Sequence, residues 1–131
     1  MLAARLRVIY ECAVYEAELE GGHALFRVGR TPEGVAPTET LAIVTAWNPA
    51  DLRPERAVNE RANASLAAAI EHGGFGYFPA VGRNSSRTHV EPSFAVVGIS
   101  RTEALALGRR YAQAAVFFWD GAEASILSCR G

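Results

Sequence analysis

Side chains with the capacity to bind a ligand are spread over most of the chain. Asn48, Asn59 and Gln113 carry amides that both donate and accept hydrogen bonds. Glu91 carries a carboxylate that can accept a proton or a ligand N–H, and Ser93 lies two residues further on. On a strand, residues at this spacing share a face. Glu91 and Ser93 are therefore candidate catalytic residues, and the three amides are candidate ligand contacts.

A second group of candidates lies in the polar stretch 82–88. Arg83 and Arg87 flank three small polar residues, and two guanidinium groups can clamp a phosphate or a carboxylate. The alternative is that this stretch is a solvated hairpin tip. His89 follows it directly, and histidine is the ordinary proton carrier at neutral pH.

Each candidate also has a purely structural interpretation. Asn48 precedes a proline, and in this setting an Asx turn is sufficient to explain its side chain. Asn59 and Asn63 lie four residues apart on one helical stripe, so both amides can instead bind the loop after Asn48. An unpaired buried amide costs about 1–3 kcal/mol, so such side chains must find partners. Glu91 can serve in a salt bridge, and Gln113 can cap a helix end.

Hydrophobic patterning predicts the element order β-β-β-α-β-β-α-β-β. Residues 7–19 place Val8, Tyr10, Cys12 and Val14 on one period-2 face, which predicts a half-buried strand. We expect the other strands at 23–28, 41–47, 75–81, 90–99 and 114–119 and in a final segment ending near 129, with a loop at 29–39. The expected helices are 54–71, with a proline at its first position, and the segment after the capping box at 100–103. The fold class is α+β, a mostly antiparallel or mixed sheet of about six to seven strands with two helices, in a single domain spanning residues 1–131.

Three of the expected strands, 41–47, 94–99 and 114–119, are apolar on both faces. Two helices can cover one face, in which case the curl of the sheet or a partner subunit covers the other. The remaining alternative places one helix on each face. A homodimer is therefore one of the outcomes that we expect.

Alternating chain direction brings the candidates to one edge of the sheet. If the strand 41–47 runs towards this edge, Asn48 lies there and the following helix leads away, which keeps Asn59 close. The next strand returns, so the 82–88 loop lies at the same edge, and Glu91 and Ser93 begin the strand after it. The second helix then delivers Gln113 to this rim. The sequence thus predicts one shared polar rim.

Composition limits the classes of partner. The chain has 13 basic and 14 acidic residues and a formal net charge of −1, so we expect no general attraction to nucleic acid or to an anionic membrane. No stretch approaches the length of a membrane span, and no signal-peptide pattern is present, which predicts a cytoplasmic protein. Cys12 and Cys129 fit a reduced, buried pair better than a disulfide. The histidines show no metal spacing, and no phosphate-loop, dinucleotide or nucleophile-elbow motif occurs, so we expect no metal and no cofactor.

Four blocks of the sequence together resemble a bacterial family of unknown function, DUF3293. They are residues 42–49 (AIVTAWNP), Asn59 with Asn63 and Leu66, residues 91–94 (EPSF) and residues 111–115 (YAQAA). The resemblance covers roughly residues 10–127. Its shared motifs add Thr45 to the candidates and coincide with Asn48, Asn59, Glu91, Ser93 and Gln113. Members often carry an aromatic residue just ahead of the glutamate block, where this chain has His89. The family has no assigned activity, so the resemblance implies no catalytic residue.

Two functions from different classes fit these observations. The first is a site for a small polar or nucleotide-like ligand at the rim, with or without catalysis. In that site Thr45, Asn48, Asn59, Asn63 and Gln113 orient the ligand, Glu91 accepts a proton or an N–H, and Arg83 and Arg87 attract an anion. The second is a noncatalytic protein-interaction module, in which the polar residues only lock loops. A nucleic-acid-modifying role through Arg83, Arg87, His89 and Glu91 is disfavoured by the charge balance.

Overall fold

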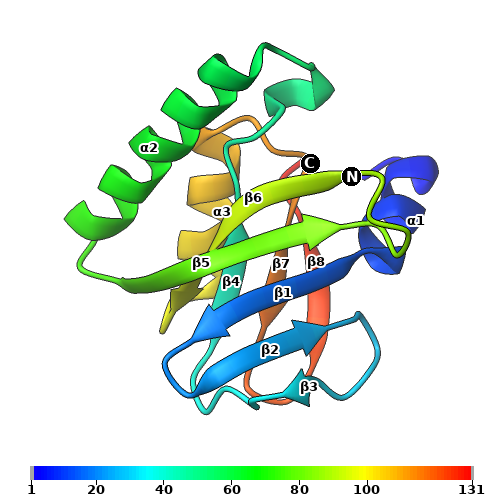
Figure 1. The fold of residues 1–131 in the computed structure, drawn as a ribbon, viewed down its shortest axis with the longest axis vertical. Helices are drawn as coiled ribbons and strands as arrows, with labels where there is room; N and C mark the ends of the chain where they lie inside the picture. The colour runs from blue at the N-terminus through cyan, green and yellow to red at the C-terminus, as the bar shows by residue number, and fades with distance from the viewer. Residues whose placement is uncertain (1, 131) are drawn as a thin grey trace.

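One antiparallel sheet of eight strands organises the part of the chain that the computed structural model describes, residues 2–130 (Figure 1). The strand order is β3-β2-β1-β5-β6-β4-β7-β8. Three α-helices and a short 3-10 turn accompany the strands. In chain order the elements are α1 (Ala4–Cys12), β1 (Val14–Leu19), β2 (Gly22–Phe26), β3 (Glu33–Gly34), β4 (Leu41–Val44), η1 (Pro49–Asp51), α2 (Arg56–His72), β5 (Gly76–Arg83), β6 (Val90–Val97), α3 (Arg101–Arg110), β7 (Ala115–Trp119) and β8 (Ala124–Ser128).

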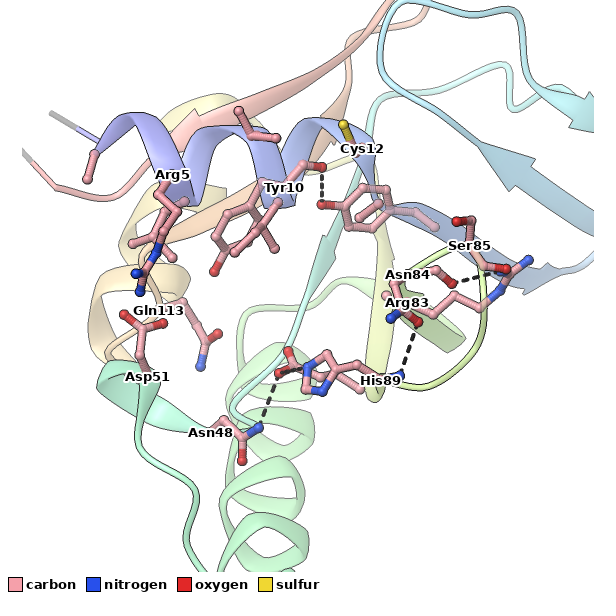
Figure 2. Close-up of a pocket in the computed structure, with 18 of the residues that line it drawn as sticks. Arg5, Tyr10, Cys12, Asn48, Asp51, Arg83, Asn84, Ser85, His89 and Gln113 are labelled. Atoms are coloured by element: carbon pink, nitrogen blue, oxygen red, sulfur yellow. Dashed lines mark hydrogen bonds and ion pairs between the residues drawn. The ribbon is translucent and has the colours of Figure 1, made fainter.

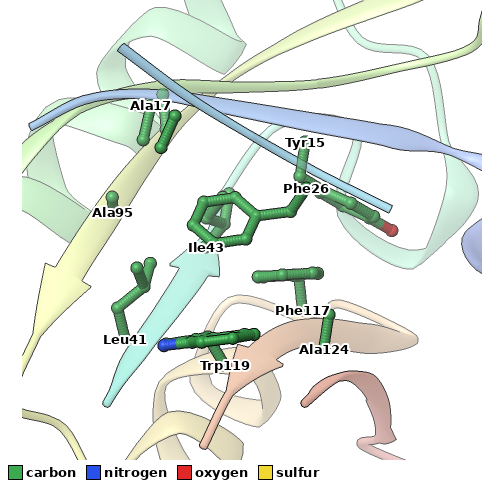
Figure 3. Close-up of a cluster of buried hydrophobic side chains, with 11 residues drawn as sticks. Tyr15, Ala17, Phe26, Leu41, Ile43, Ala95, Phe117, Trp119 and Ala124 are labelled. Atoms are coloured by element: carbon green, nitrogen blue, oxygen red, sulfur yellow. The ribbon is translucent and has the colours of Figure 1, made fainter. Parts of the chain in front are cut away.

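The sheet curls so that its two halves pack against each other. The ring of Phe117 on β7 lies 4.6 Å from that of Tyr15 on β1 and 5.1 Å from that of Phe26 on β2, measured between centroids. Three strands separate β1 from β7 in the sheet, so these contacts require strong curvature. Trp119 and Ile43 join the same cluster (Figure 3). Among the expected ways to cover this face of the sheet, the structure therefore shows coverage by the curl of the sheet itself.

Both long helices cover the opposite, convex face. Leu66 and Ile70 of α2 are fully buried, and they belong to one cluster with Ala104 of α3 and Phe118 of β7. Gly108 of α3 permits the close approach, because a Cβ there would lie 2.8 Å from Val116 and 2.5 Å from the Cys129 sulfur. The alternative with one helix on each face is therefore wrong.

The ends of the two long helices show which local signals are reliable. Ser100 and Glu103 form the expected capping box at the start of α3. Gly74, with a φ of 79°, takes the left-handed conformation just after α2. The expected position of Pro54 is wrong by two residues, because α2 has Glu55 as its N-cap and begins at Arg56.

The expected strand over 7–19 is wrong in its first half, because Ala4–Cys12 is helical and β1 begins at Val14. Leu6 and Tyr10 lie four residues apart on the helix and pack with Leu2 against Ala114. Val8, which belonged to the expected strand face, is 60% exposed. The helix count of two and the strand count of about six to seven are corrected accordingly, since the expected loop at 29–39 also contains the short strand β3.

The two cysteines are both free, and they differ in exposure. Cys129 is buried, and its burial raises the pKa of the thiol. Cys12 lies at the end of α1 and is exposed, which corrects the expected buried pair. None of the helices in the described part of the chain combines the length and the apolar character needed to cross a membrane.

Candidate functional site

The antiparallel pairing of β4 with β6 places the end of one strand beside the start of the other. Val44 is in register with Phe94, so the residues after β4 lie next to those that open β6. The Asn48 side chain donates a hydrogen bond from Nδ2 to Oε2 of Glu91 at 3.3 Å. The Asn-Pro corner and the Glu-Pro-Ser segment therefore meet at one rim.

A directed chain of hydrogen bonds holds the Glu91 carboxylate. Asn59 on α2 accepts the backbone N–H of Asn48 at Oδ1, and its Nδ2 donates to the Asn48 side-chain oxygen, both at 2.9 Å. Asn48 in turn donates a hydrogen bond from its side-chain Nδ2 to Oε2 of Glu91, and Nε2 of His89 lies 2.9 Å from the same carboxylate oxygen. Asn48 takes a left-handed conformation, with φ of 48°, that asparagine tolerates well. Asn59 thus fixes Asn48, and Asn48 fixes Glu91.

Thr45 and Asn63 use their polar atoms to join the β4 end to β6. The Thr45 hydroxyl donates to the Pro92 carbonyl at 2.7 Å, and Asn63 Nδ2 donates to the same oxygen at 2.9 Å. Asn63 Oδ1 accepts the buried N–H of Ala46 at 2.8 Å. Neither side chain lines the large cavity described below. Both side chains therefore join backbone segments, and Asn63 does so at Ala46 and Pro92 and not at the loop after Asn48.

Replacing Asn63 with alanine is expected to lower the free energy of unfolding by about 2 kcal/mol. The change strands the Ala46 N–H in a buried position and removes one of the two donors to Pro92. Urea unfolding measures the loss. Glu60→Ala, an exposed change on the same helix, should stay within about 0.5 kcal/mol of wild type. A loss for Asn63→Ala no larger than that of the control would contradict the role of this amide.

Ser93 is buried, and its hydroxyl donates to the backbone carbonyl of Glu91 at 3.0 Å. Its side chain does not reach the carboxylate of Glu91 through any hydrogen bond in the described structure, and Ser93 does not line the cavity. The two residues are neighbours in sequence with separate tasks.

Arg83 and Arg87 turn towards Glu16 on β1. Arg83 Nε lies 2.5 Å from the Glu16 carboxylate, and Arg87 lies 3.5 Å from the same oxygen. Arg83 Nη1 also donates to the carbonyl of Asn84. The pKa of Glu16 is lowered, mainly by the hydrogen bond from Arg83. The charge of Arg83 is therefore already balanced within the protein, and sequence reasoning missed its partner because that partner lies on a strand 67 residues away.

A cavity of about 880 Å³ opens between α1 and the rim (Figure 2). Asn48, His89, Glu91 and Gln113 form its polar side, and Arg83 contributes to its edge. The opposite wall comes from α1, which contributes Leu6, Val8, Ile9 and Tyr10 among others. Cavities of this size are typical of small-molecule sites.

Several residues of the cavity escape sequence reasoning because the sequence predicts a strand over 7–19, where the structure has most of α1. Tyr10 is the main example, since on a strand its side chain would have faced the core together with Val8 and Cys12. Burial raises the pKa of Tyr10 to about 12, and the charges of Glu91 and Asp51 add to the shift. The phenol therefore keeps its proton across the neutral range. The spacing of Leu6 and Tyr10, four residues apart, was the available signal for a helix.

A family model described as a protein of unknown function, DUF3293, matches residues 44–116, more than half of the 131 residues. The chain belongs to the DUF3293 family. This confirms the resemblance drawn from the four sequence blocks. No curated protein and no solved structure matches the chain.

The segment that matches DUF3293 contains every candidate residue named from the sequence, from Thr45 to Gln113. The α1 wall of the cavity lies outside it. Within this DUF3293 protein, the residues 2–130 contain no cluster of three or more histidine, cysteine or acidic side chains placed to hold a metal ion.

Gln113 lies at the inner end of the cavity, just after a strained residue. Ala112 has a φ of 55°, and its carbonyl accepts the N–H of Ala50 at 2.8 Å. The Gln113 side chain donates from Nε2 to the carbonyls of Trp47 and Tyr111, both at 3.2 Å. Gln113 thus ties the turn after α3 to the end of the β4 segment and still lines the cavity.

Proposed function

We propose that this protein binds a small polar ligand in the cavity between α1 and the rim. The observation that carries the proposal is the convergence of Asn48, the His89–Glu91 segment and Gln113, from three separate parts of the chain, on one cavity of about 880 Å³. The hydrogen bonds from Asn59 to Asn48 and from Asn48 to Glu91 hold the carboxylate in one orientation. Such support is expected of a side chain that contacts a ligand.

The candidate residues divide into contacts and supports under this proposal. Glu91 and Gln113 contact the ligand, and Asn59, Asn63 and Thr45 act through the backbone and through Asn48. Arg83 and Arg87 form ion pairs with Glu16, so we do not assign either of them to bind an anionic group of the ligand. Any proton transfer falls to the His89–Glu91 pair, which has the composition of a general acid–base pair.

A thermal-shift screen against nucleotides, nucleobases, sugars and amino-acid metabolites tests the proposal. A ligand present at about 100 times its dissociation constant should add about 2.7 kcal/mol of stability. Glu91→Gln should remove most of that gain, because it keeps the shape and loses the charge. Glu60→Gln is the matched control, since Glu60 is exposed and pairs only with Arg56 in the described structure. Failure of the whole panel to stabilise wild type would contradict the proposal.

Exposed apolar side chains favour a second candidate, the protein-interaction module. Val8 and Ile9 on α1 are 60% and 57% exposed, and Leu52 after η1 is 65% exposed. Under this alternative α1 binds a protein, such as a second copy of the chain. A panel without hits, together with a dimer in light scattering that Ile9→Ser dissociates, would favour the module over the ligand site.

A further inference from the structure

The inner end of the cavity presents an acceptor oxygen that has no partner. Gln113 is only 8% exposed, and Nε2 uses its hydrogens on two backbone carbonyls. Exchanging the amide nitrogen and oxygen would set an oxygen against both carbonyls, so the orientation is fixed by chemistry. The remaining atom, Oε1, accepts no hydrogen bond from residues 2–130. The inner surface therefore offers a nearly buried carbonyl oxygen to whatever enters.

Glu91 offers a second acceptor on the same surface. Its Oε2 receives both Asn48 Nδ2 and His89 Nε2. Its Oε1 receives no donor from the described residues, and the side chain is 24% exposed. When Nε2 of a neutral His89 donates to the carboxylate, the Nδ1 atom of that ring is an acceptor as well.

Several donors near this surface are already committed. Both amide hydrogens of Gln113 and one of Asn48 point at protein oxygens, and Arg83 is paired with Glu16. Arg5 and Arg53 also line the cavity, but both are exposed and therefore lie on its solvent side. Figure 2 shows Tyr10 and Arg5 reaching from α1 towards Gln113 and Asp51, with Asn48 and His89 across the cavity. Burial raises the pKa of Tyr10, and the charges of Glu91 and Asp51 add to the shift, so its phenol remains a hydrogen-bond donor on the α1 side.

We propose that the inner end of the cavity binds a planar nitrogen group with two or more N–H donors, of the amidine, guanidine or aminopurine class. Such a group can donate to the free oxygens of Glu91 and Gln113, which line one cavity, and a forked pair of N–H donors suits a carboxylate. An anionic group placed against these two oxygens would be repelled by the Glu91 carboxylate and by the Gln113 carbonyl dipole. This inference rests on the proposed ligand site and specifies its chemistry.

Benzamidine and benzoate, which have similar shapes and opposite charges, form the test. Isothermal titration calorimetry should show benzamidine binding to the wild-type protein and weaker or absent binding of benzoate. Glu91→Gln should weaken benzamidine about tenfold or more, because it removes a charged hydrogen-bond acceptor. Glu60→Gln should leave the affinity unchanged. A nuclear magnetic resonance titration of wild type adds a readout that needs no variant, since the side-chain amide signals of Gln113 should shift with benzamidine.

Each result decides the inference separately from the proposed site. Benzoate binding more tightly than benzamidine, with the Gln113 signals shifting, would overturn the N–H donor class and keep the ligand site. Equal benzamidine affinity in wild type and Glu91→Gln would overturn the inference, as would absence of binding by both probes at millimolar concentration. In that last case the metabolite panel alone decides whether the site itself survives. Thermal unfolding without ligand shows that Glu91→Gln is folded before its affinity is interpreted.

Discussion

Replacing Phe117 with alanine is expected to lower the free energy of unfolding by about 4 kcal/mol, as measured by urea denaturation. Phe117 is 1% exposed, and its ring packs against those of Tyr15 and Phe26 where the curled sheet closes on itself. Truncation removes the transfer free energy of the ring and leaves a cavity that the hydrogen-bonded strands of the curled sheet cannot collapse to fill. The α1 wall of the candidate site also packs on this half of the sheet, through β8.

A double-mutant cycle separates the energy of the ring contact across the curled sheet from the energy of burying a phenylalanine side chain. Phe26→Ala and Phe117→Ala should couple by about 1 kcal/mol, because their rings are in contact. Phe118→Ala is the matched control, since Phe118 is equally buried but belongs to the helix-covered face. Its effect should add to that of Phe26→Ala within about 0.5 kcal/mol. Additivity of the Phe26 and Phe117 changes would contradict the packing of β2 on β7.

Local chemistry was sufficient to predict elements whose signals are contiguous. The capping box of α3 and the apolar runs of β4, β6 and β7 all lie within short windows, and each is found where its pattern indicates. The N-terminal helix failed the same procedure. Residues 8–14 satisfy a period of two through Val8, Tyr10, Cys12 and Val14, while Leu6 and Tyr10 satisfy a helical period, and the sequence alone does not decide between them. The contact of α1 with Ala114 and Ile126, far along the chain, decides it.

The shape of the sheet could not be predicted for a related reason. Tyr15 and Phe117 are separated by most of the chain, and each is an ordinary aromatic residue in its own strand. Which strands become neighbours determines the curl, and that choice depends on the total burial of all strands. The sequence therefore restricted the cover of the second face to a few alternatives without selecting among them.

The rim followed from alternating chain direction, but the task of each rim residue did not. Asn63 and Gln113 are both buried amides, and they look equivalent in the sequence. The Asn63 amide is used up by Ala46 and Pro92, whereas Gln113 keeps one oxygen facing the cavity. The difference arises from the position of each backbone partner in three dimensions. The same holds for Arg83, because the pairing of β1 with β5 brings its partner Glu16 close to it.

Glu16→Leu is expected to destabilise the protein by about 3–5 kcal/mol at pH 7. Arg83 has a side-chain exposure of 7%, so removal of the carboxylate leaves a buried guanidinium without its counter-charge. The matched control is Glu18→Leu on the same strand, where the side chain is 65% exposed and the expected change is within about 0.5 kcal/mol. Urea unfolding of the two variants measures the difference directly.

The pH dependence of the same pair has a definite sign. The pKa of Glu16 is lower in the folded protein than its ordinary value of 4.5, mainly because Arg83 donates a hydrogen bond to the carboxylate. The unfolded chain therefore binds this proton first, and the stability from Glu16 is fully present above pH 4.5 and falls as the pH drops through the folded pKa. Wild type should lose stability below pH 4.5 more steeply than Glu16→Leu, in urea titrations at matched ionic strength. Parallel profiles would mean that Arg83 does not depend on Glu16, and Arg83 would then again be available to bind an anion in the cavity.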